Sequence, residues 1–308
     1  MKILVIGAGG VGGYFGAVLA KAGNEVTFLA RGRHLTAIET SGLKITSPNG
    51  DFVLDHVTAV ESLENMGPVD VILLAVKAWQ VSDSARALNR MRANKFIIIP
   101  LQNGVESYDE VSAIVGPERT LGGTCKIISY IESPGHIVHL GIEPEITFGE
   151  WDNKRSSRVD EFAACLRHAG IKYDVPANFQ LELWKKFMFL ASYAGVGSVT
   201  RAPIGRMRAI PESRKLIADA MSEIVMLAHA YEIPLSESLV ERSLALIDTM
   251  QFEATSSMQR DVIDGKPSEL HYLSGAVVRL AAQKGISVPT HNFMYSALLP
   301  GEMLARKL

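Results

Sequence analysis

The sequence predicts an α/β protein with a doubly wound parallel sheet at its N-terminus and an all-helical domain at its C-terminus. Three observations lead to this prediction. Short apolar runs alternate with helical segments in the first part of the chain, a Gly-x-Gly-x-x-Gly string follows the first apolar run, and helical periodicity alone remains after about residue 178. A chain of 308 residues is long enough for two domains, each with its own core.

Residues 2–29 have the pattern of one strand-helix-strand unit. Residues 2–6 form a continuous apolar run, as expected of a parallel strand that is buried on both faces. The glycine string comes next, residues 14–22 have helical character and end at Gly23, and residues 25–29 have the pattern of a second strand. This unit is typical of the start of a Rossmann-type sheet.

Further strands and helices follow along the chain. Apolar runs recur at residues 69–76 and 96–101, with a helical segment at 81–91 between them. Short strand-like runs then dominate, and we expect them to form antiparallel strands at one edge of the sheet. These runs are residues 126–131, 137–140 and 145–148.

Helices dominate the last part of the chain, where apolar residues recur at three- and four-residue spacing. The predicted helices are residues 181–194, 211–230, 236–250, 256–263 and 268–284. Strand-like sequence stops near Pro176, so we place the boundary there, with domains at 1–177 and 178–308. The apolar positions of the second and third helices belong either to the core or to a subunit interface, which leaves a homodimer as an alternative.

The composition favours a small-molecule partner. Thirty-one basic and 33 acidic residues give a net charge of −2, which argues against a protein built for nucleic acid or for an anionic membrane. We expect a cytoplasmic protein, because the N-terminus lacks the pattern of a signal peptide and no uncharged stretch reaches the 18 or so residues of a spanning helix. Cys125 and Cys165 are expected to be buried thiols.

Metal binding is not expected. His136 and His139 form a His-x-x-His string, but they fall in a strand-like segment, where residues three apart point to opposite faces.

The glycine string is a weak signal by itself, but its context indicates a dinucleotide site. Gly7, Gly9 and Gly12 lie between a strand and a helix, within a unit of about thirty residues. Gly7 permits the tight turn, Gly9 lets the backbone approach a pyrophosphate, and Gly12 allows the helix to pack closely on the strand. The N–H groups at the start of the helix bind the anion. The predicted cofactor-binding residues of this loop are Gly7, Ala8, Gly9, Gly10, Val11 and Gly12.

The end of the second strand favours NADP(H) as the cofactor. NAD-binding proteins normally have an acidic residue there that binds the ribose 2′-hydroxyl, whereas this chain has Arg31 and no Asp or Glu between Glu25 and Glu39. Together with Arg33, Arg31 is suited to hold a 2′-phosphate through charge-assisted hydrogen bonds. For Arg33 and His34, a place at the solvated start of a helix fits the sequence equally well.

Two polar residues follow the next strands of the sheet. Lys77 closes the first of the later apolar runs, and Asn103 lies in a polar turn straight after the second. Ligands of open α/β sheets bind outside the carboxyl ends of the strands, so we expect both residues to contact the cofactor. For Asn103, which is followed by Gly104, a simple turn is the alternative.

With these motifs placed, the whole chain resembles the ketopantoate reductases (2-dehydropantoate 2-reductases). The resemblance rests on the glycine motif and on the strings Leu74-Ala75-Val76-Lys77, Leu101-Gln102-Asn103-Gly104, Trp184-Lys185-Lys186-Phe187, Ser256-Ser257-Met258 and Glu269. It implies a Rossmann domain joined to a helical domain. It also implies reduction of the ketone of a 2-oxo acid by NADPH, which gives pantoate for the synthesis of pantothenate and coenzyme A.

The resemblance implies a role for each site residue. Lys186, rather than Lys185, matches the general acid that protonates the substrate oxygen, Glu269 the residue that hydrogen-bonds the substrate's hydroxyl or oxo group, and Ser257 the residue that binds its carboxylate. Asn103 aligns substrate and nicotinamide. A lysine serves best as the acid when desolvation lowers its pKa from about 10.4 toward the working pH.

Local chemistry alone also explains the same residues without a role in catalysis. Adjacent lysines on a helix are usually solvated, and Glu269 would favour the first turn of a helix capped by Ser268 whatever its function.

The chain departs from the family pattern at three positions. Family members often have asparagine four and eight residues after the lysine and three residues before the serine, where this chain has Leu190, Ala194 and Ala254. Loss of these amides should change the recognition of a substrate hydroxyl. These departures favour one alternative, a reductase of a different, more apolar 2-oxo acid. A non-catalytic NADP-binding protein is a separate alternative, against which the presence of Lys186 and Glu269 speaks.

Overall fold

The computed structural model describes residues 1–64, 66–88 and 95–308, which divide into two compact units. Unit 1 comprises Met1–Gln102 and Ser107–Phe179, and unit 2 comprises Asn103–Glu106 and Gln180–Leu308. The division between the two units after Phe179 lies close to the domain boundary expected from the sequence, between residues 177 and 178. The grouping of Asn103–Glu106 with the helical unit differs from the expected division, because this segment makes its contacts there.

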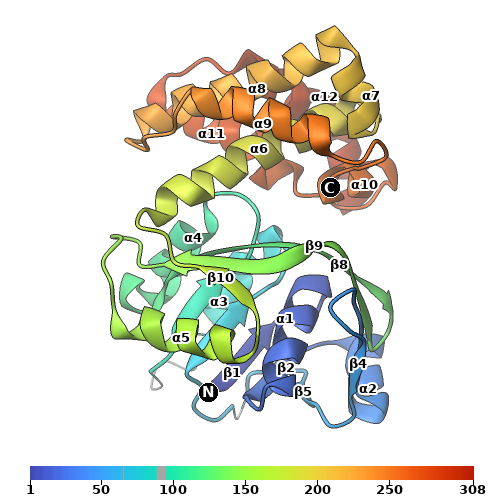
Figure 1. The fold of residues 1–308 in the computed structure, drawn as a ribbon, viewed down its shortest axis with the longest axis vertical. Helices are drawn as coiled ribbons and strands as arrows, with labels where there is room; N and C mark the ends of the chain where they lie inside the picture. The colour runs from blue at the N-terminus through green and yellow to red at the C-terminus, as the bar shows by residue number, and fades with distance from the viewer. Residues whose placement is uncertain (65, 89–94) are drawn as a thin grey trace. The chain divides into compact units, whose positions relative to one another are not determined.

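Unit 1 is built on a five-stranded parallel sheet in the order β5-β2-β1-β6-β7 (Figure 1). The strands are β1 (Lys2–Ile6), β2 (Glu25–Leu29), β5 (Thr58–Val60), β6 (Val71–Leu74) and β7 (Ile97–Pro100). The predicted strands at 69–76 and 96–101 are therefore confirmed but shorter. The order places β1 at the centre, as a doubly wound sheet requires.

The central strand β1 explains why the sequence reads as a continuous apolar run. Ile3 and Val5 belong to one hydrophobic core, whereas Leu4 and Ile6 belong to a second core on the other face of the sheet. Because both faces are covered, alternation with polar residues is lost.

Helices pack on both faces of this sheet. The first core includes residues of α1 (Gly10–Lys21), α2 (Gly32–Ser41) and α5 (Ser157–His168). The second includes residues of α3 (Val81–Leu88) and α4 (Ser107–Val115). The predicted helix at 81–91 is confirmed as far as Leu88, and its end lies outside the described residues. Among the residues that the structure describes, unit 1 also has two short 3-10 helices, η1 (Ala78–Gln80) and η3 (Pro117–Arg119).

The antiparallel strands predicted at residues 126–148 are confirmed, but they are longer than expected and belong to a second sheet. These residues form one long hairpin of β8 (Gly122–Ser133) and β9 (His136–Gly149), joined by β3 (Leu43–Thr46), β4 (Phe52–Leu54) and β10 (Lys172–Asp174). The pairing of β8 with β9 is irregular near residues 126–128 and 131–133, so the alternation of apolar and polar residues is interrupted there. The hairpin begins beside the edge strand β7, with a single parallel bridge between Ile98 and Thr120.

Unit 2 is helical, as the sequence predicts (Figure 1). Its helices are α6 (Phe179–Thr200), α7 (Ile204–Ala209), α8 (Pro211–Ala230), α9 (Ser238–Thr249), α10 (Ser257–Ile263), η4 (Leu270–Tyr272), α11 (Ser274–Lys284) and α12 (Pro289–Arg306). Among the described residues, no helix has the length and apolar character needed to cross a membrane.

Two features of unit 2 differ from the expectation. The predicted helix at 268–284 is divided, because Leu273 has a ψ of −94° that separates η4 from α11. Helix α12 escapes the sequence pattern because Pro300 lies inside it. In unit 1, the expected burial of both cysteines is correct for Cys125, whereas Cys165 is only partly buried.

The start of α12 is secured by a buried pair in unit 2. The Glu223 carboxylate accepts hydrogen bonds from the backbone N–H groups of Thr290 and His291 at 2.7 and 3.0 Å. The His291 side chain is fully buried, and its Nε2 lies 3.1 Å from the Ala220 carbonyl oxygen, which requires Nε2 to be the donor. Burial lowers the pKa of His291 to about 4.

We expect acid to destabilise the protein through His291. In the unfolded chain the imidazole gains its proton near pH 6.5, whereas in the folded chain it does so near pH 4. Stability is therefore lost as the pH falls between these values, with a slope of up to about 1.4 kcal/mol per pH unit. Urea unfolding of wild type and His291→Gln from pH 7 to 4 measures this loss. A pH dependence that is as steep in the variant as in wild type would contradict the assignment.

Candidate cofactor and substrate sites

The glycine loop of unit 1 leaves open space in front of helix α1. Gly7 has a φ of +97°, and a Cβ there would lie 2.9 Å from the backbone of Ala75. A Cβ at Gly12 would lie 2.2 Å from the Gly7 carbonyl oxygen, so this position also requires glycine. A Cβ at Gly9, by contrast, would meet nothing within 4 Å. The loop is thus tightly packed at Gly7 and Gly12 and has open space at Gly9, directly before the first turn of α1, where a helix N-terminus can bind an anion.

His34 connects the glycine loop to the hairpin of the second sheet. Its Nε2 lies 2.8 Å from the Ala8 carbonyl oxygen, and the Gly135 N–H donates to its Nδ1 at 3.1 Å. This pattern requires the neutral ring with its proton on Nε2. Burial lowers the pKa of His34, which favours the same form. The sequence alone leaves His34 ambiguous, because its partners lie 26 and 101 residues away.

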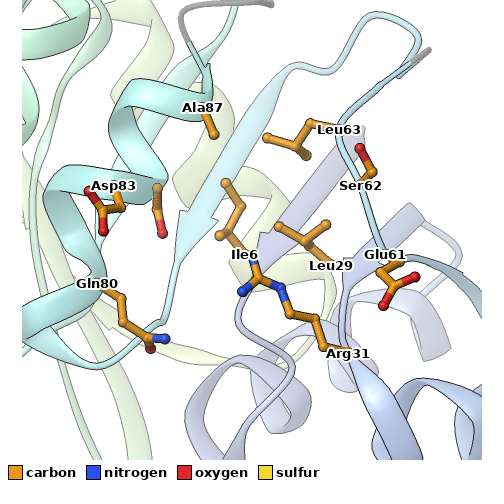
Figure 2. Close-up of a pocket in the computed structure, with 10 residues that line it drawn as sticks. Ile6, Leu29, Arg31, Glu61, Ser62, Leu63, Gln80, Asp83 and Ala87 are labelled. Carbon is orange, nitrogen blue, oxygen red and sulfur yellow. The ribbon is translucent and has the colours of Figure 1, made fainter.

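A cavity of about 340 Å³ lies beside the end of β2 (Figure 2). Arg31 extends into it, with Gln80 and Asp83 on one wall and Glu61 on the other. An adjoining cavity of about 260 Å³ is lined by the glycine loop, Arg31, His34 and Gln80, among other residues. The two cavities share Arg31 and Gln80, and together they extend from the glycine loop to Ser62 and Leu63.

The electrostatics at Arg31 are more balanced than the sequence alone indicates. Arg33 is exposed and does not line either cavity, whereas two carboxylates, Glu61 and Asp83, line the larger one. Asp83 forms an ion pair with Arg86 at 2.8 Å, which partly offsets its charge. Arg31 is thus the cation of this cavity that could meet a 2′-phosphate. Glu61 and Asp83 lie outside the segment in which an acidic residue is usually sought, so sequence reasoning did not find them.

Lys77 lies beyond β6 and has an exposed side chain. Its ammonium is 5.8 Å from the ring centre of Trp79. The neighbouring turn is fixed by Gln102, whose Nε2 donates to the carbonyl oxygens of Leu74 and Val76 at 2.8 and 2.9 Å. The turns after β6 and β7 are therefore held together.

In unit 2, the structure brings Asn103 and Glu269 into contact. The Asn103 Nδ2 donates to the Glu269 Oε2 at 2.9 Å. Gly104, with a φ of +95°, packs so closely on the Tyr272 carbonyl oxygen that a Cβ would lie 2.8 Å away. An ion pair of 2.7 Å between Glu106 and Arg279 secures the same segment. Two predicted site residues that are 166 positions apart therefore form one polar pair.

The two adjacent lysines of α6 have different surroundings. Lys185 pairs with Glu182 at 2.6 Å, on the partly exposed side of the helix. Lys186 is half-buried and lies on the face predicted to hold Leu190, Tyr193 and Gly197.

Further along this face of α6, Tyr193 and Gly197 are buried. Burial raises the pKa of Tyr193 to about 12, and among the described residues its hydroxyl has no hydrogen-bond partner. Gly197 is in close contact with Gln259, because a Cβ there would lie 2.5 Å from the Gln259 Oε1. The Tyr193 phenol and the Gln259 amide of α10 are thus two polar groups along this face.

Ser257 is exposed at the first residue of α10. The preceding Ser256 is buried, and its Oγ accepts a hydrogen bond from the Gln259 N–H at 3.0 Å, which caps the helix. Nearby, the Ala254 carbonyl oxygen accepts from the Ile204 N–H at 3.0 Å. Of the two adjacent serines, Ser256 has the structural role and Ser257 has its hydroxyl at the surface.

The two histidines of the His-x-x-His string have separate partners in the second sheet. His136 Nε2 lies 3.0 Å from the Thr46 Oγ1, and His139 Nδ1 lies 2.8 Å from the Ser47 Oγ. Across the described ranges, no group of three or more His, Cys, Asp or Glu residues is arranged to hold a metal ion.

Arg31 should set the preference between NADPH and NADH. We expect Arg31→Ala to weaken NADPH binding about 10- to 100-fold, the value of a charge-assisted hydrogen bond, with little effect on NADH. Titration of each cofactor against intrinsic fluorescence measures both affinities. Arg33→Ala is the control and should leave both unchanged, and Glu61→Gln should tighten NADPH binding. Equal losses for the two cofactors in Arg31→Ala would contradict this role.

Comparison with known proteins covers almost the whole chain. Residues 3–153 match the family described as ketopantoate reductase PanE/ApbA, and residues 178–302 match its C-terminal domain. An uncharacterized oxidoreductase YkpB of Bacillus subtilis is 30% identical over 97% of this chain and 98% of its own. A 2-dehydropantoate 2-reductase structure from Geobacter metallireducens is 29% identical, with a TM-score of 0.89 over 97% of this chain and 99% of its own. D-mandelate dehydrogenase with NADH and anilino(oxo)acetate shares the fold, with a TM-score of 0.89 at 21% identity over 99% of this chain and 100% of its own.

Proposed function

Because the chain belongs to the ketopantoate reductase family, we propose that it is an NADPH-dependent 2-dehydropantoate 2-reductase. In this proposal it reduces the ketone of ketopantoate to the hydroxyl of pantoate, for pantothenate and coenzyme A synthesis. The observation that carries the proposal is the 2.9 Å hydrogen bond between Asn103 and Glu269, the two polar residues that the family resemblance assigns to the substrate.

The cofactor is assigned to unit 1. The open side of the glycine loop at Gly9 and the cavity at Arg31 fit a dinucleotide with a 2′-phosphate. A dinucleotide held there by the glycine loop and Arg31 would supply the hydride for the carbonyl carbon of the substrate. Lys77 supports this assignment less directly, as an exposed cation beyond β6.

The chemistry at the substrate is assigned to unit 2. Lys186 gives a proton from Nζ to the carbonyl oxygen as the carbon–oxygen double bond becomes single, so that a hydroxyl results. Glu269 accepts a hydrogen bond from the substrate, and its bond from Asn103 Nδ2 fixes the carboxylate for this task. Ser257, with its exposed hydroxyl, binds the substrate carboxylate. The main contributions are orientation and the stabilisation of developing charge.

A second candidate substrate is a 2-oxo acid with a more apolar side chain. The observation that favours it is the absence of amides at Leu190, Ala194 and Ala254, where family members often have asparagine. A site that hydrogen-bonds a substrate hydroxyl discriminates strongly, whereas an apolar wall does not. The two candidates share the cofactor, the acid and the reaction, and differ in the substrate's side chain.

Turnover should depend on Lys186 and not on its neighbour. We expect Lys186→Ala to lower kcat about 100- to 10,000-fold, the usual contribution of a general acid, while NADPH binding is retained. Lys185→Ala is the matched control and should keep nearly full activity, because Lys185 pairs with Glu182. The measurement is the loss of NADPH absorbance at 340 nm with ketopantoate and a panel of 2-oxo acids.

The panel separates the candidates. Turnover of ketopantoate above all others supports the first, and turnover of a branched or aromatic oxo acid without ketopantoate supports the second. NADPH binding without turnover of any oxo acid would contradict both and favour a non-catalytic protein.

A further inference from the structure

A buried carboxylate of the last helix contacts the chain directly beside Glu269. Glu302 of α12 has an exposed fraction of 6%. It accepts hydrogen bonds from the Ser268 backbone N–H at 3.0 and 3.1 Å and from the Ser268 hydroxyl at 2.5 Å. Its counter-ion is Arg306, one helical turn later, at 2.6 Å. The carboxylate is thus fully engaged with one residue of the site segment and one cation.

This network holds the peptide groups on both sides of Glu269. Arg306 donates to the Ser268 carbonyl oxygen at 2.7 Å, which fixes the peptide group that precedes Glu269. The Leu270 N–H donates to the Ser268 Oγ at 3.2 Å, which fixes the peptide group that follows it. Glu269 itself has φ −89° and ψ 20°, in the sparsely populated bridge region where active-site residues are often found. Holding both peptide groups sets the direction in which its side chain leaves the backbone.

Stability alone is a weak reason for such an arrangement. A buried ion pair often contributes little to stability compared with apolar residues of the same volume, because both charges lose their hydration.

We propose that Glu302 and Arg306 are positioning residues for the reaction, which fix the backbone of Glu269 so that its carboxylate stays aligned with Asn103. This inference rests on the proposed function, in which Glu269 contacts the substrate. Neither Glu302 nor Arg306 touches the substrate in this account, and they act through Ser268.

Glu223 offers a matched control within the same unit. It is about equally buried, with an exposed fraction of 5%, and it also binds the backbone: it accepts two N–H groups at the opposite end of α12, whereas Glu302 accepts one. Glu302→Gln and Glu223→Gln therefore each remove one buried charge from a backbone-binding carboxylate. We expect comparable losses of Tm in the two variants.

Activity should separate the two variants. We expect Glu302→Gln to lower kcat about 10- to 100-fold, as a misplaced catalytic group does, with an unchanged NADPH Kd. Glu223→Gln should change kcat less than about twofold. In a Glu269→Gln background, Glu302→Gln should have almost no further effect, because both substitutions remove the same function. Equal effects of Glu302→Gln and Glu223→Gln on kcat, or a full effect in the Glu269→Gln background, would overturn the proposal.

A second readout does not depend on turnover. The side-chain amide signals of Asn103, assigned by their loss in Asn103→Asp, report its hydrogen bond to Glu269 in ¹⁵N-labelled protein. We expect these signals to shift in Glu302→Gln and to stay in place in Glu223→Gln; unchanged signals in both would contradict the positioning role. If wild type reduced no 2-oxo acid, the proposed function would fail, while the Asn103 signals would still decide whether Glu302 sets the geometry of Glu269.

Discussion

The hydrogen bond from Asn103 to Glu269 is the constraint around which the site in unit 2 is organised. It joins two segments that are 166 residues apart, and each segment has its own support. The Asn103 segment is held by the close packing of Gly104 and by the ion pair of Glu106. The Glu269 segment is held by Glu302 through Ser268. A carboxylate held from two directions has little freedom, which is the condition for orienting a small substrate.

The site in unit 1 follows from a different constraint, the close approach of α1 to the sheet. Gly12 brings the helix against the Gly7 carbonyl, and Gly9 keeps the space in front of the helix open. His34 then ties the Ala8 carbonyl to the hairpin of the second sheet. The loop is thereby held before any ligand binds, which reduces the entropy cost of binding a dinucleotide.

The sequence predicts the fold class well because its strongest signals are local. The buried run of β1, the glycine loop and the helical periodicity after residue 178 each depend on near neighbours, and each is found in the structure. The strands of the long hairpin were predicted as shorter pieces, because their irregular pairing interrupts the alternation. Helix α12 was missed because Pro300 lies within it.

For the candidate sites, the sequence indicated which residues to select but not which of them contact one another. Asn103 and Glu269 were selected separately, but their contact depends on the path of the whole chain. Glu61 and Glu302 were not selected and His34 was left open, because the role of each depends on a partner far along the sequence or on a cavity. A local signal for Glu302 does not exist, since its importance lies in Ser268, 34 residues away.

We propose that Asn103 and Glu269 act as one unit on the substrate. A double-mutant cycle measures this coupling most directly. The values of kcat/KM for Asn103→Ala, Glu269→Gln and the double variant would be compared with wild type in the 2-oxo acid assay. The account predicts that each single substitution lowers kcat/KM about 10- to 100-fold, and that the double variant is barely worse than either. Losses that multiply, as expected of independent sites, would contradict it.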